Sequence, residues 1–208
     1  MLLFDMDGTL IDSNGIWKDV DEEFLARRGL SYTQEYYEGV AHTIFPLAAK
    51  FTKEFCHLPE SEEEIMAEWM ELAGDIYATN VEEKPGVRAF LEKMKAAGER
   101  MAVVTSAVPV HCRSALGHLK LLPYFEQVFF AQELGTEKKY PELWERVAEE
   151  LGVAPGECTL FDDSVEAIRG AKRAGMHTVG VADPYFAASA EEMKKTAERY
   201  IGSFTELL

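Results

Sequence analysis

The chain has 208 residues, with 21 Lys and Arg against 37 Asp and Glu, so its formal net charge is −16. This length suits one domain with a sizeable insertion. With 47% hydrophobic residues, the composition is that of a globular protein and not of a disordered or fibrous chain. The acidity argues against nucleic acid or an anionic membrane as a main partner, because both require a basic surface.

The cysteines and the first residues bear on the compartment. Cys56, Cys112 and Cys158 are widely spaced, without a CxxC pair, which favours free thiols in a reducing environment over disulfides or a zinc site. The opening apolar run stops at Asp5 and is too short for a signal peptide. No later run approaches the roughly 18 apolar residues of a membrane span. We therefore expect a cytoplasmic protein.

Five short apolar runs predict β-strands, and amphipathic helices follow most of them. None of the runs alternates polar and apolar residues, which favours strands covered on both faces, as in a parallel sheet. Helices are expected after Pro85, Pro141 and Asp163, and Gly175 stands where a left-handed helix end is expected. The runs are Leu2 to Phe4, Met101 to Val104, Val128 to Phe130, Thr159 to Phe161 and Thr178 to Val181. This alternation predicts an α/β fold, a Rossmann-like parallel sheet with helices on both faces.

The stretch from residue 13 to residue 83 breaks this alternation. It contains no convincing strand, but apolar residues recur at helical spacing in two neighbouring stripes, which is typical of a small helical bundle. Its 5 basic and 16 acidic residues give a charge of 5 − 16 = −11. We therefore expect an α/β core made of residues 1–12 and 84–208, with residues 13–83 inserted as a helical domain.

The strongest chemical signal lies at the end of the first predicted strand. Residues 4–10 read FDMDGTL, so an apolar strand ends in two carboxylates, Asp5 and Asp7, followed by a Gly-Thr turn. Carboxylates at the carboxyl end of a parallel strand are well placed for a ligand. They could share a divalent cation, or one could act as a nucleophile while the other transfers a proton. The alternative is a solvated strand end followed by an ordinary turn.

Three later segments place further polar side chains near strand ends. Thr105 and Ser106 end the second strand, and hydroxyls together with backbone N–H groups can bind a phosphoryl oxygen. Lys138 stands shortly before a predicted helix. Asp162 and Asp163 end the fourth strand, where adjacent carboxylates repel each other unless a cation or a helix N-terminus compensates. Taken singly, each segment also fits a helix cap or a solvated charge.

In this order, the four segments resemble the haloacid dehalogenase superfamily of aspartate-nucleophile hydrolases. The resemblance covers residues 1–12 and 84–208, and the insertion falls where subfamily I carries its helical C1 cap. The DxDGT motif of residues 5–9 is the specific element, whereas the other motifs are individually degenerate. The resemblance implies a phosphoric monoester hydrolase, similar to phosphatases of small metabolites, phosphoglycolate phosphatases and β-phosphoglucomutase-like enzymes.

The resemblance also implies roles for individual residues. Asp5 would attack phosphorus and form an aspartyl-phosphate. Asp7 would protonate the leaving oxygen and then deprotonate the hydrolytic water. Thr105, Ser106 and Lys138 would hold the transferring phosphoryl group and neutralise its charge. The substrate would be a small phosphorylated metabolite under a cap that closes and excludes water.

The implied cofactor is Mg²⁺. Asp5, the backbone carbonyl of Asp7, and Asp163 would bind it, with Asp162 acting directly or through water. An all-oxygen site of this kind suits magnesium, which keeps several waters and bridges one or two carboxylates to a substrate phosphate.

The lysine motif departs from the usual family pattern, Lys-Pro-x-Pro-Asp. Residues 138–142 read KKYPE, so the first proline is absent. Counting back three residues from Pro141 selects Lys138 as the phosphate-binding lysine, and Lys139 is the alternative.

Within the family, Asp7 favours phosphate-ester chemistry, because dehalogenases and phosphonatases lack this carboxylate. A sugar-phosphate mutase keeps it and remains an alternative. Mutases usually carry an arginine after a glycine in a cap loop, whereas here the loop after Gly39 offers His42. We expect a phosphatase, with His42 and Thr43 facing the substrate.

Two rival readings come from other classes of protein. A phosphoacceptor receiver domain also combines acidic residues, a hydroxyl and a lysine on a parallel sheet, but its acidic pair comes first and its lysine last. A binding protein that has lost catalysis is a second rival, although every expected catalytic position is filled. The sequence leaves the substrate and the oligomeric state open, and one core with one cap is compatible with a monomer.

Overall fold

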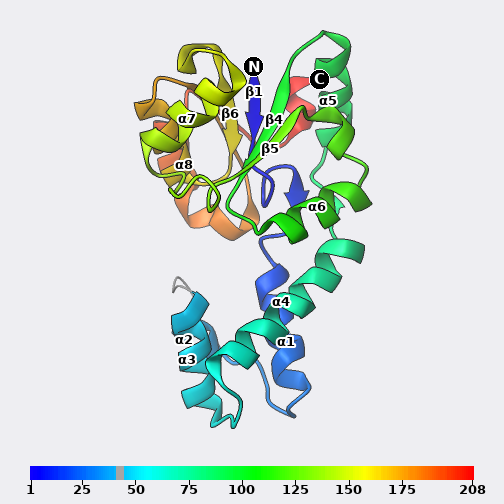
Figure 1. Cartoon of the computed structure of the whole chain (residues 1–208), viewed down its shortest axis with the longest axis vertical. Coiled ribbons are helices and arrows are strands. Elements are labelled where there is room, and N and C mark those ends of the chain that lie inside the picture. Colours follow the sequence, from blue (N-terminus) through cyan, green and yellow to red (C-terminus); the bar gives the residue numbers. More distant parts are fainter. Residues whose placement is uncertain (41–44) are drawn as a thin grey trace. The chain divides into compact units, whose positions relative to one another are not determined.

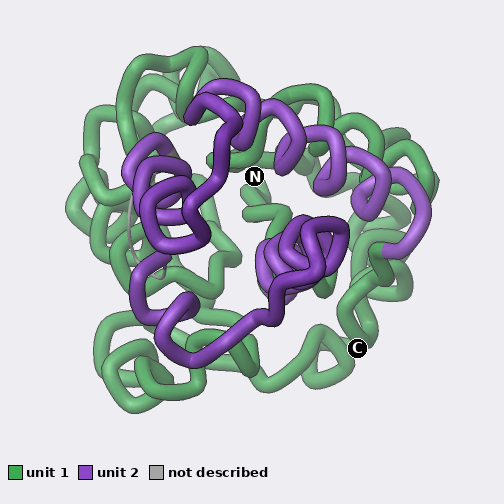
Figure 2. The backbone as a smooth tube through the Cα atoms, turned by 90° about the horizontal axis from the view of Figure 1, so that it is seen from below, with its two compact units in different colours: residues 1–14, 81–208 green, residues 15–80 purple. Residues whose placement is uncertain are grey.

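The protein is described by a computed structural model that covers residues 1–40 and 45–208. It contains two compact units (Figure 2). Unit 1 consists of residues 1–14 and 81–208, and unit 2 consists of residues 15–80. Unit 1 is therefore built from both ends of the chain, with unit 2 inserted after residue 14.

Unit 1 contains a six-stranded sheet in the order β5-β4-β1-β6-β7-β8, in which every neighbouring pair is parallel (Figure 1). The strands are β1 (Leu2–Phe4), β4 (Met101–Thr105), β5 (Gln127–Phe130), β6 (Thr159–Asp162), β7 (His177–Val181) and β8 (Arg199–Ile201). The five strands expected from the sequence are confirmed. The sixth, β8, was not predicted, because a strand of three residues, only one of them buried, leaves no pattern to detect.

Helices cover both faces of this sheet, which explains why its strands lack alternation. Leu3 in β1 is fully buried in a cluster with Trp144 and Ile168. Its neighbour Phe4 points to the opposite face, because successive strand residues alternate, and stacks on Phe161 with ring centroids 4.9 Å apart. The helices of unit 1 are α5 (Val87–Ala96), α6 (Pro109–His118), α7 (Pro141–Leu151), α8 (Val165–Arg173) and α9 (Ala190–Thr196).

The expected helix signals hold in the structure. Pro141 is the first residue of α7, where its missing N–H costs no hydrogen bond. Gly175, which follows α8, has a φ of 89°, a left-handed conformation that residues with a Cβ rarely adopt. The α/β class predicted from the sequence is thus confirmed.

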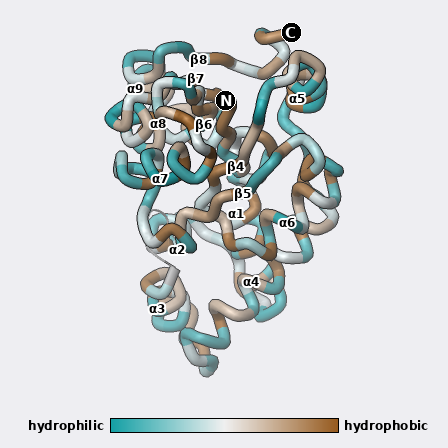
Figure 3. The backbone as a smooth tube through the Cα atoms, turned by 45° about the horizontal axis from the view of Figure 1, so that its top comes forward, coloured by the Kyte–Doolittle hydropathy of each residue, from teal (hydrophilic) through white to brown (hydrophobic). Residues whose placement is uncertain are grey.

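In the part of unit 2 that the structure describes, helices joined by turns are the regular secondary structure. Its helices are α1 (Ile16–Ala26), α2 (Gln34–Val40), α3 (Phe45–Cys56) and α4 (Glu62–Thr79). Ser61 caps α4 in a reciprocal capping box with Glu64. Hydrophobic and hydrophilic stretches alternate along α4 (Figure 3), and its buried face includes Trp69, whose ring packs edge-on against Phe24 with centroids 5.6 Å apart.

A short ribbon joins the two points where the chain leaves and re-enters unit 1. It pairs β2 (Ile11–Asp12) with β3 (Glu82–Glu83) in antiparallel orientation. The expectation that residues 13–83 contain no strand is therefore wrong at Glu82–Glu83, because two residues are too few to carry a periodic pattern. In the described ranges, no helix has the length and apolar character required to span a membrane.

Candidate active site

Asp5 and Asp7 lie at the carboxyl end of the central strand. The backbone N–H of Asp5 donates to the carbonyl of Phe161, which continues the pairing of β1 with β6. The chain then turns tightly, and Gly8 adopts a φ of 75°. A Cβ on Gly8 would lie 2.1 Å from both Asn14 Nδ2 and Asp163 Oδ2, so only glycine fits this turn. The Gly of the DxDGT motif thus serves the close packing of the site.

Strand β6 lies beside β1 in the sheet (Figure 1). Asp162 is its last residue and Asp163 follows, so a second pair of carboxylates stands at the carboxyl end of the neighbouring strand. Asp162 Oδ1 accepts a hydrogen bond from the backbone N–H of Ser164 at 2.8 Å. One carboxylate oxygen each from Asp5, Asp162 and Asp163 lie within 4.8 Å of one another, and all three residues are buried. We call these three residues the carboxylate cluster.

Lys138 joins this cluster from the loop before α7. Its Nζ lies 2.6 Å from Asp5 Oδ1 and 2.8 Å from Asp162 Oδ2, and its side chain is only 11% exposed. Lys139, the alternative lysine, pairs with Glu137 and is 41% exposed. The structure therefore brings Lys138, and not Lys139, to Asp5.

The electrostatics of the cluster reflect three buried carboxylates beside one ammonium. Burial raises the pKa of Asp5, and the charge of Lys138 only partly opposes this. The same balance raises the pKa of Asp162 to about 7. Burial, together with the charges of Asp5 and Asp162, raises the pKa of Asp163 well above its usual range. For Lys138, the two carboxylates outweigh burial and raise its pKa.

This arrangement fits a metal ion. Oxygen atoms from three carboxylates converge within 4.8 Å. Among the residues that the structure describes, Lys138 is the cation that pairs with them, and it contacts Asp5 and Asp162 but not Asp163. Adjacent buried carboxylates are costly without a compensating positive charge. The side chain of Asp7 is not part of the cluster; its Oδ1 accepts a hydrogen bond from Ser13 Oγ at 2.6 Å.

The hydroxyl residues lie at the end of β4, beside β1. Thr105 is fully buried, and its Oγ1 accepts a hydrogen bond from the backbone N–H of Ala107 at 3.0 Å. This leaves the hydroxyl hydrogen of Thr105 available to donate. Ser106 is exposed. His42 and Thr43, expected to face the substrate, lie outside the described residues.

Three residues that orient the carboxylates were not anticipated. Asn14 Nδ2 donates to Asp163 Oδ2 at 2.8 Å, and Thr9 Oγ1 lies 3.4 Å from Asp163 Oδ1. Ser13 holds Asp7, as described above. Thr9 belongs to the DxDGT motif and could have been found there, whereas nothing in the sequence relates Asn14 to a carboxylate 149 residues away.

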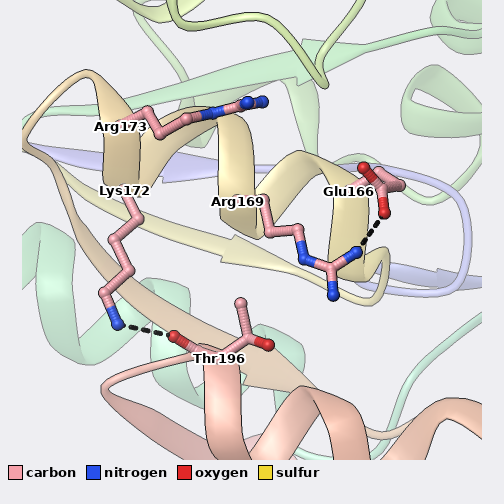
Figure 4. A pocket seen from close by; sticks show the side chains of 5 residues that line it. All are labelled: Glu166, Arg169, Lys172, Arg173 and Thr196. Carbon is pink, nitrogen blue, oxygen red and sulfur yellow. Dashed lines mark hydrogen bonds and ion pairs between the residues drawn. The ribbon is translucent and has the colours of Figure 1, made fainter.

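A hollow lies on the surface formed by α8 and α9 (Figure 4). Its volume is about 260 Å³, and it contains none of the residues expected in the active site. Its basic groups are already engaged, since Lys172 Nζ donates to the carbonyl of Thr196 at 2.9 Å and Arg169 pairs with Glu166. The carboxylate cluster, and not this hollow, is therefore the candidate active site.

The chain is similar in sequence to proteins named as phosphatases. A phosphorylated carbohydrates phosphatase from Thermotoga maritima is 26% identical over 178 residues, which cover 86% of this chain and 82% of that protein. Fructose-1-phosphate phosphatase YqaB from Escherichia coli is 28% identical over 180 residues, covering 86% of this chain and 95% of that protein.

The fold itself is shared with solved structures. CbbY from Rhodobacter sphaeroides, solved in complex with phosphate, matches with a TM-score of 0.78 at 23% identity, covering 99% of this chain and 95% of that one. The family model described as haloacid dehalogenase-like hydrolase matches residues 2–181. Since this match spans most of the chain, the protein belongs to the haloacid dehalogenase-like hydrolase family.

Proposed function

We propose that the protein is a Mg²⁺-dependent phosphatase that hydrolyses a small phosphorylated metabolite through an aspartyl-phosphate on Asp5. The observation that carries this proposal is the contact of Lys138 Nζ with Asp5 Oδ1 at 2.6 Å. Asp5 belongs to the carboxylate cluster, and the chain belongs to a hydrolase family. A lysine beside the nucleophile is suited to hold the phosphoryl group that the nucleophile receives.

In the first step, a carboxylate oxygen of Asp5 attacks phosphorus. The new bond joins Oδ of Asp5 to phosphorus, and the bond from phosphorus to the substrate's ester oxygen breaks. Asp7 donates a proton to that leaving oxygen, so the product departs as an alcohol. Ser13 Oγ, 2.6 Å from Asp7 Oδ1, supports this role because it holds the side chain in a defined orientation.

In the second step, Asp7, now deprotonated, takes a proton from a water molecule. The water oxygen attacks phosphorus, the bond to Asp5 breaks, and inorganic phosphate leaves while both carboxylates return to their starting states.

The remaining residues stabilise the phosphoryl group during both steps. Lys138 supplies a positive charge, and the hydroxyl of Thr105 donates a hydrogen bond from a fully buried position. The backbone N–H of Ser106, the residue that follows β4, would add a further donor. These groups are held in place before the reaction, so little reorganisation is needed when charge shifts toward the leaving oxygen.

The metal would be held by Asp5, Asp162, Asp163 and the backbone carbonyl of Asp7. When bound, Mg²⁺ supplies positive charge that offsets the charge of the phosphoryl oxygens and of the carboxylates. The all-oxygen donor set supports magnesium over softer metals, which favour sulfur or nitrogen ligands.

Two relatives support this class of substrate, because their names specify phosphorylated carbohydrates and fructose 1-phosphate. We infer a small phosphorylated metabolite of this kind, with residues 13–83 as the cap that selects it. All three cysteines are free, which supports action in a reducing, cytoplasmic compartment.

The testing experiment is phosphate release from a panel of small phosphomonoesters, with and without Mg²⁺, by the wild type and by Asp5→Asn. We expect metal-dependent release by the wild type and a loss of at least about 10³-fold in the variant, because amide oxygen is a poor nucleophile. Asp12→Asn, which changes an exposed carboxylate on β2, is the matched control and should retain activity.

Two outcomes would contradict the proposal. Phosphate release that is unchanged in Asp5→Asn would exclude Asp5 as the nucleophile. Interconversion of hexose phosphate isomers without release of phosphate would identify a mutase.

A further inference from the structure

The loop that carries Lys138 is held by two helices through its main chain. The carbonyl oxygen of Lys138 accepts a hydrogen bond from Trp144 Nε1 at 2.7 Å. Trp144 lies on α7 and is fully buried, so its indole packs in the core while its N–H is directed to the loop. The next carbonyl, that of Lys139, accepts a hydrogen bond from Arg173 on α8. Figure 4 shows the side chain of Arg173 extending away from Lys172 and Thr196.

The same loop passes directly over Gly170 on α8. A Cβ on Gly170 would lie 2.1 Å from the carbonyl oxygen of Lys138, 2.8 Å from Trp144 Nε1 and 2.9 Å from the carbonyl carbon of Lys139. Glycine is unfavourable inside a helix by about 1 kcal/mol relative to alanine. Its presence here is explained by the close approach of the loop, since any side chain would displace the carbonyl that Trp144 holds.

These main-chain contacts bear on the candidate active site through the side chain of Lys138. The carbonyl held by Trp144 belongs to the residue whose Nζ lies 2.6 Å from Asp5 and 2.8 Å from Asp162. A displacement of the Lys138 main chain therefore moves its ammonium relative to both carboxylates. In preorganised sites, shifts of about 1 Å cost up to roughly a hundredfold in rate.

We propose that Trp144 and Gly170 are positioning residues for Lys138: the indole N–H and the bare glycine surface together set the height of the loop above α8. The kinetic part of this proposal rests on the proposed function, whereas the placement of Lys138 does not.

The test compares Trp144→Phe, which keeps an aromatic ring but removes the donor, with Gly170→Ala. Each variant has a matched control. Val147→Ala changes an equally buried residue of the same helix α7. Gly117→Ala changes a glycine of α6 whose added Cβ would meet only a side-chain carbon of Leu122, at 3.8 Å.

Two quantities are measured on each variant. The first is the rate of reductive methylation of Lys138 relative to Lys139, read by peptide mass spectrometry; Lys139 is exposed and adjacent, so it serves as an internal reference. The second is kcat for phosphate release at saturating Mg²⁺. Thermal unfolding shows which variants are folded.

We expect Trp144→Phe and Gly170→Ala to raise the Lys138:Lys139 labelling ratio several-fold and to lower kcat about tenfold, as expected for loss of a buried hydrogen bond. The two controls should leave the ratio and kcat unchanged, even where Val147→Ala lowers the unfolding temperature. A stability defect alone does not change this ratio in the folded protein, so the readout separates positioning from packing.

The proposal is overturned if folded Trp144→Phe keeps the wild-type ratio and kcat. If Gly170→Ala does not fold, Trp144→Phe decides the result. If the wild type releases no phosphate from any ester, the proposed function fails, and the labelling ratio still tests the placement of Lys138.

Discussion

At the scale of single residues, the candidate active site contains more buried negative charge than positive charge. The carboxylate cluster gathers three buried acids, while Lys138 reaches only two of them. A buried charge without a partner lowers the stability of the folded protein. A bound metal ion would supply the positive charge that the three carboxylates lack here.

This imbalance makes Lys138 the most informative residue to change. We predict that Lys138→Ala lowers kcat about 10²- to 10³-fold, because a positioned positive charge on the phosphoryl group is lost. Steady-state kinetics on the best substrate measures the effect. Lys139→Ala is the control: its side chain pairs with Glu137 at the surface, so near-normal turnover is expected. The opposite ranking of the two variants would transfer the role to Lys139.

At the scale of elements, one hydroxyl ties three helices of unit 2 together. Tyr36 on α2 donates to Asp21 Oδ1 on α1 at 3.0 Å, and its oxygen lies 2.9 Å from Thr52 Oγ1 on α3. Tyr36 and Thr52 are fully buried. Burial raises the pKa of Asp21 to about 6, although the hydrogen bond from Tyr36 opposes this shift.

The raised pKa predicts a pH-dependent stability. A carboxyl whose pKa is higher in the folded state destabilises the protein as pH rises from its unfolded value, 3.8, through about 6. Asp21→Asn keeps an acceptor for Tyr36 and removes the charge. We expect it to raise the free energy of unfolding by about 1–2 kcal/mol at pH 7.5, allowing for partial solvent screening, and to have no such benefit below pH about 4.

Urea unfolding at pH 4 and pH 7.5 measures this difference. Asp75→Asn, which changes an exposed carboxyl on α4, is the control and should show no comparable gain. A constant effect of Asp21→Asn at both pH values would exclude titration of Asp21 as its cause.

At the scale of the whole molecule, the candidate site residues and most of the net negative charge lie in different units. The described residues with predicted catalytic, phosphate-binding or metal-binding roles all belong to unit 1, which comprises residues 1–14 and 81–208. Unit 2 holds 5 basic and 14 acidic residues, a net charge of 5 − 14 = −9, so it carries most of the acidity of the chain. We propose that unit 2 determines which phosphate ester is accepted.

This division predicts the effect of removing unit 2. Replacing residues 17–80 with a short linker should change the ranking of substrates in the phosphomonoester panel at least tenfold, while Mg²⁺ affinity stays within about threefold, because the metal ligands remain. Calorimetric titration with Mg²⁺ measures the affinity, and circular dichroism verifies that the shortened chain is folded. An equal loss of metal affinity and of substrate selection would contradict the two-part organisation.

The features that could be predicted from the sequence are those that leave a pattern among neighbouring residues. Uninterrupted apolar runs, prolines near helix starts and helical spacing of apolar residues are local signals, so the five strands, α5, α7 and α8 could be predicted. The DxDGT motif and the acidic pair at residues 162–163 were visible because strand ends carry unusual charge. Three short strands, β2, β3 and β8, were not predicted, because none of them carries an uninterrupted apolar run like that of the similarly short β1.

Tertiary structure alone decided how the separate motifs meet. The sequence left Lys138 and Lys139 as candidates for the phosphate-binding lysine. In the fold, Lys138 contacts Asp5. Trp144 donates a hydrogen bond to its carbonyl, and Gly170 leaves room for this loop to pack on α8. Asn14 reaches Asp163 for a similar reason, across 149 positions of the chain. Such contacts depend on distances between elements, which packing determines and which no local pattern of residues records.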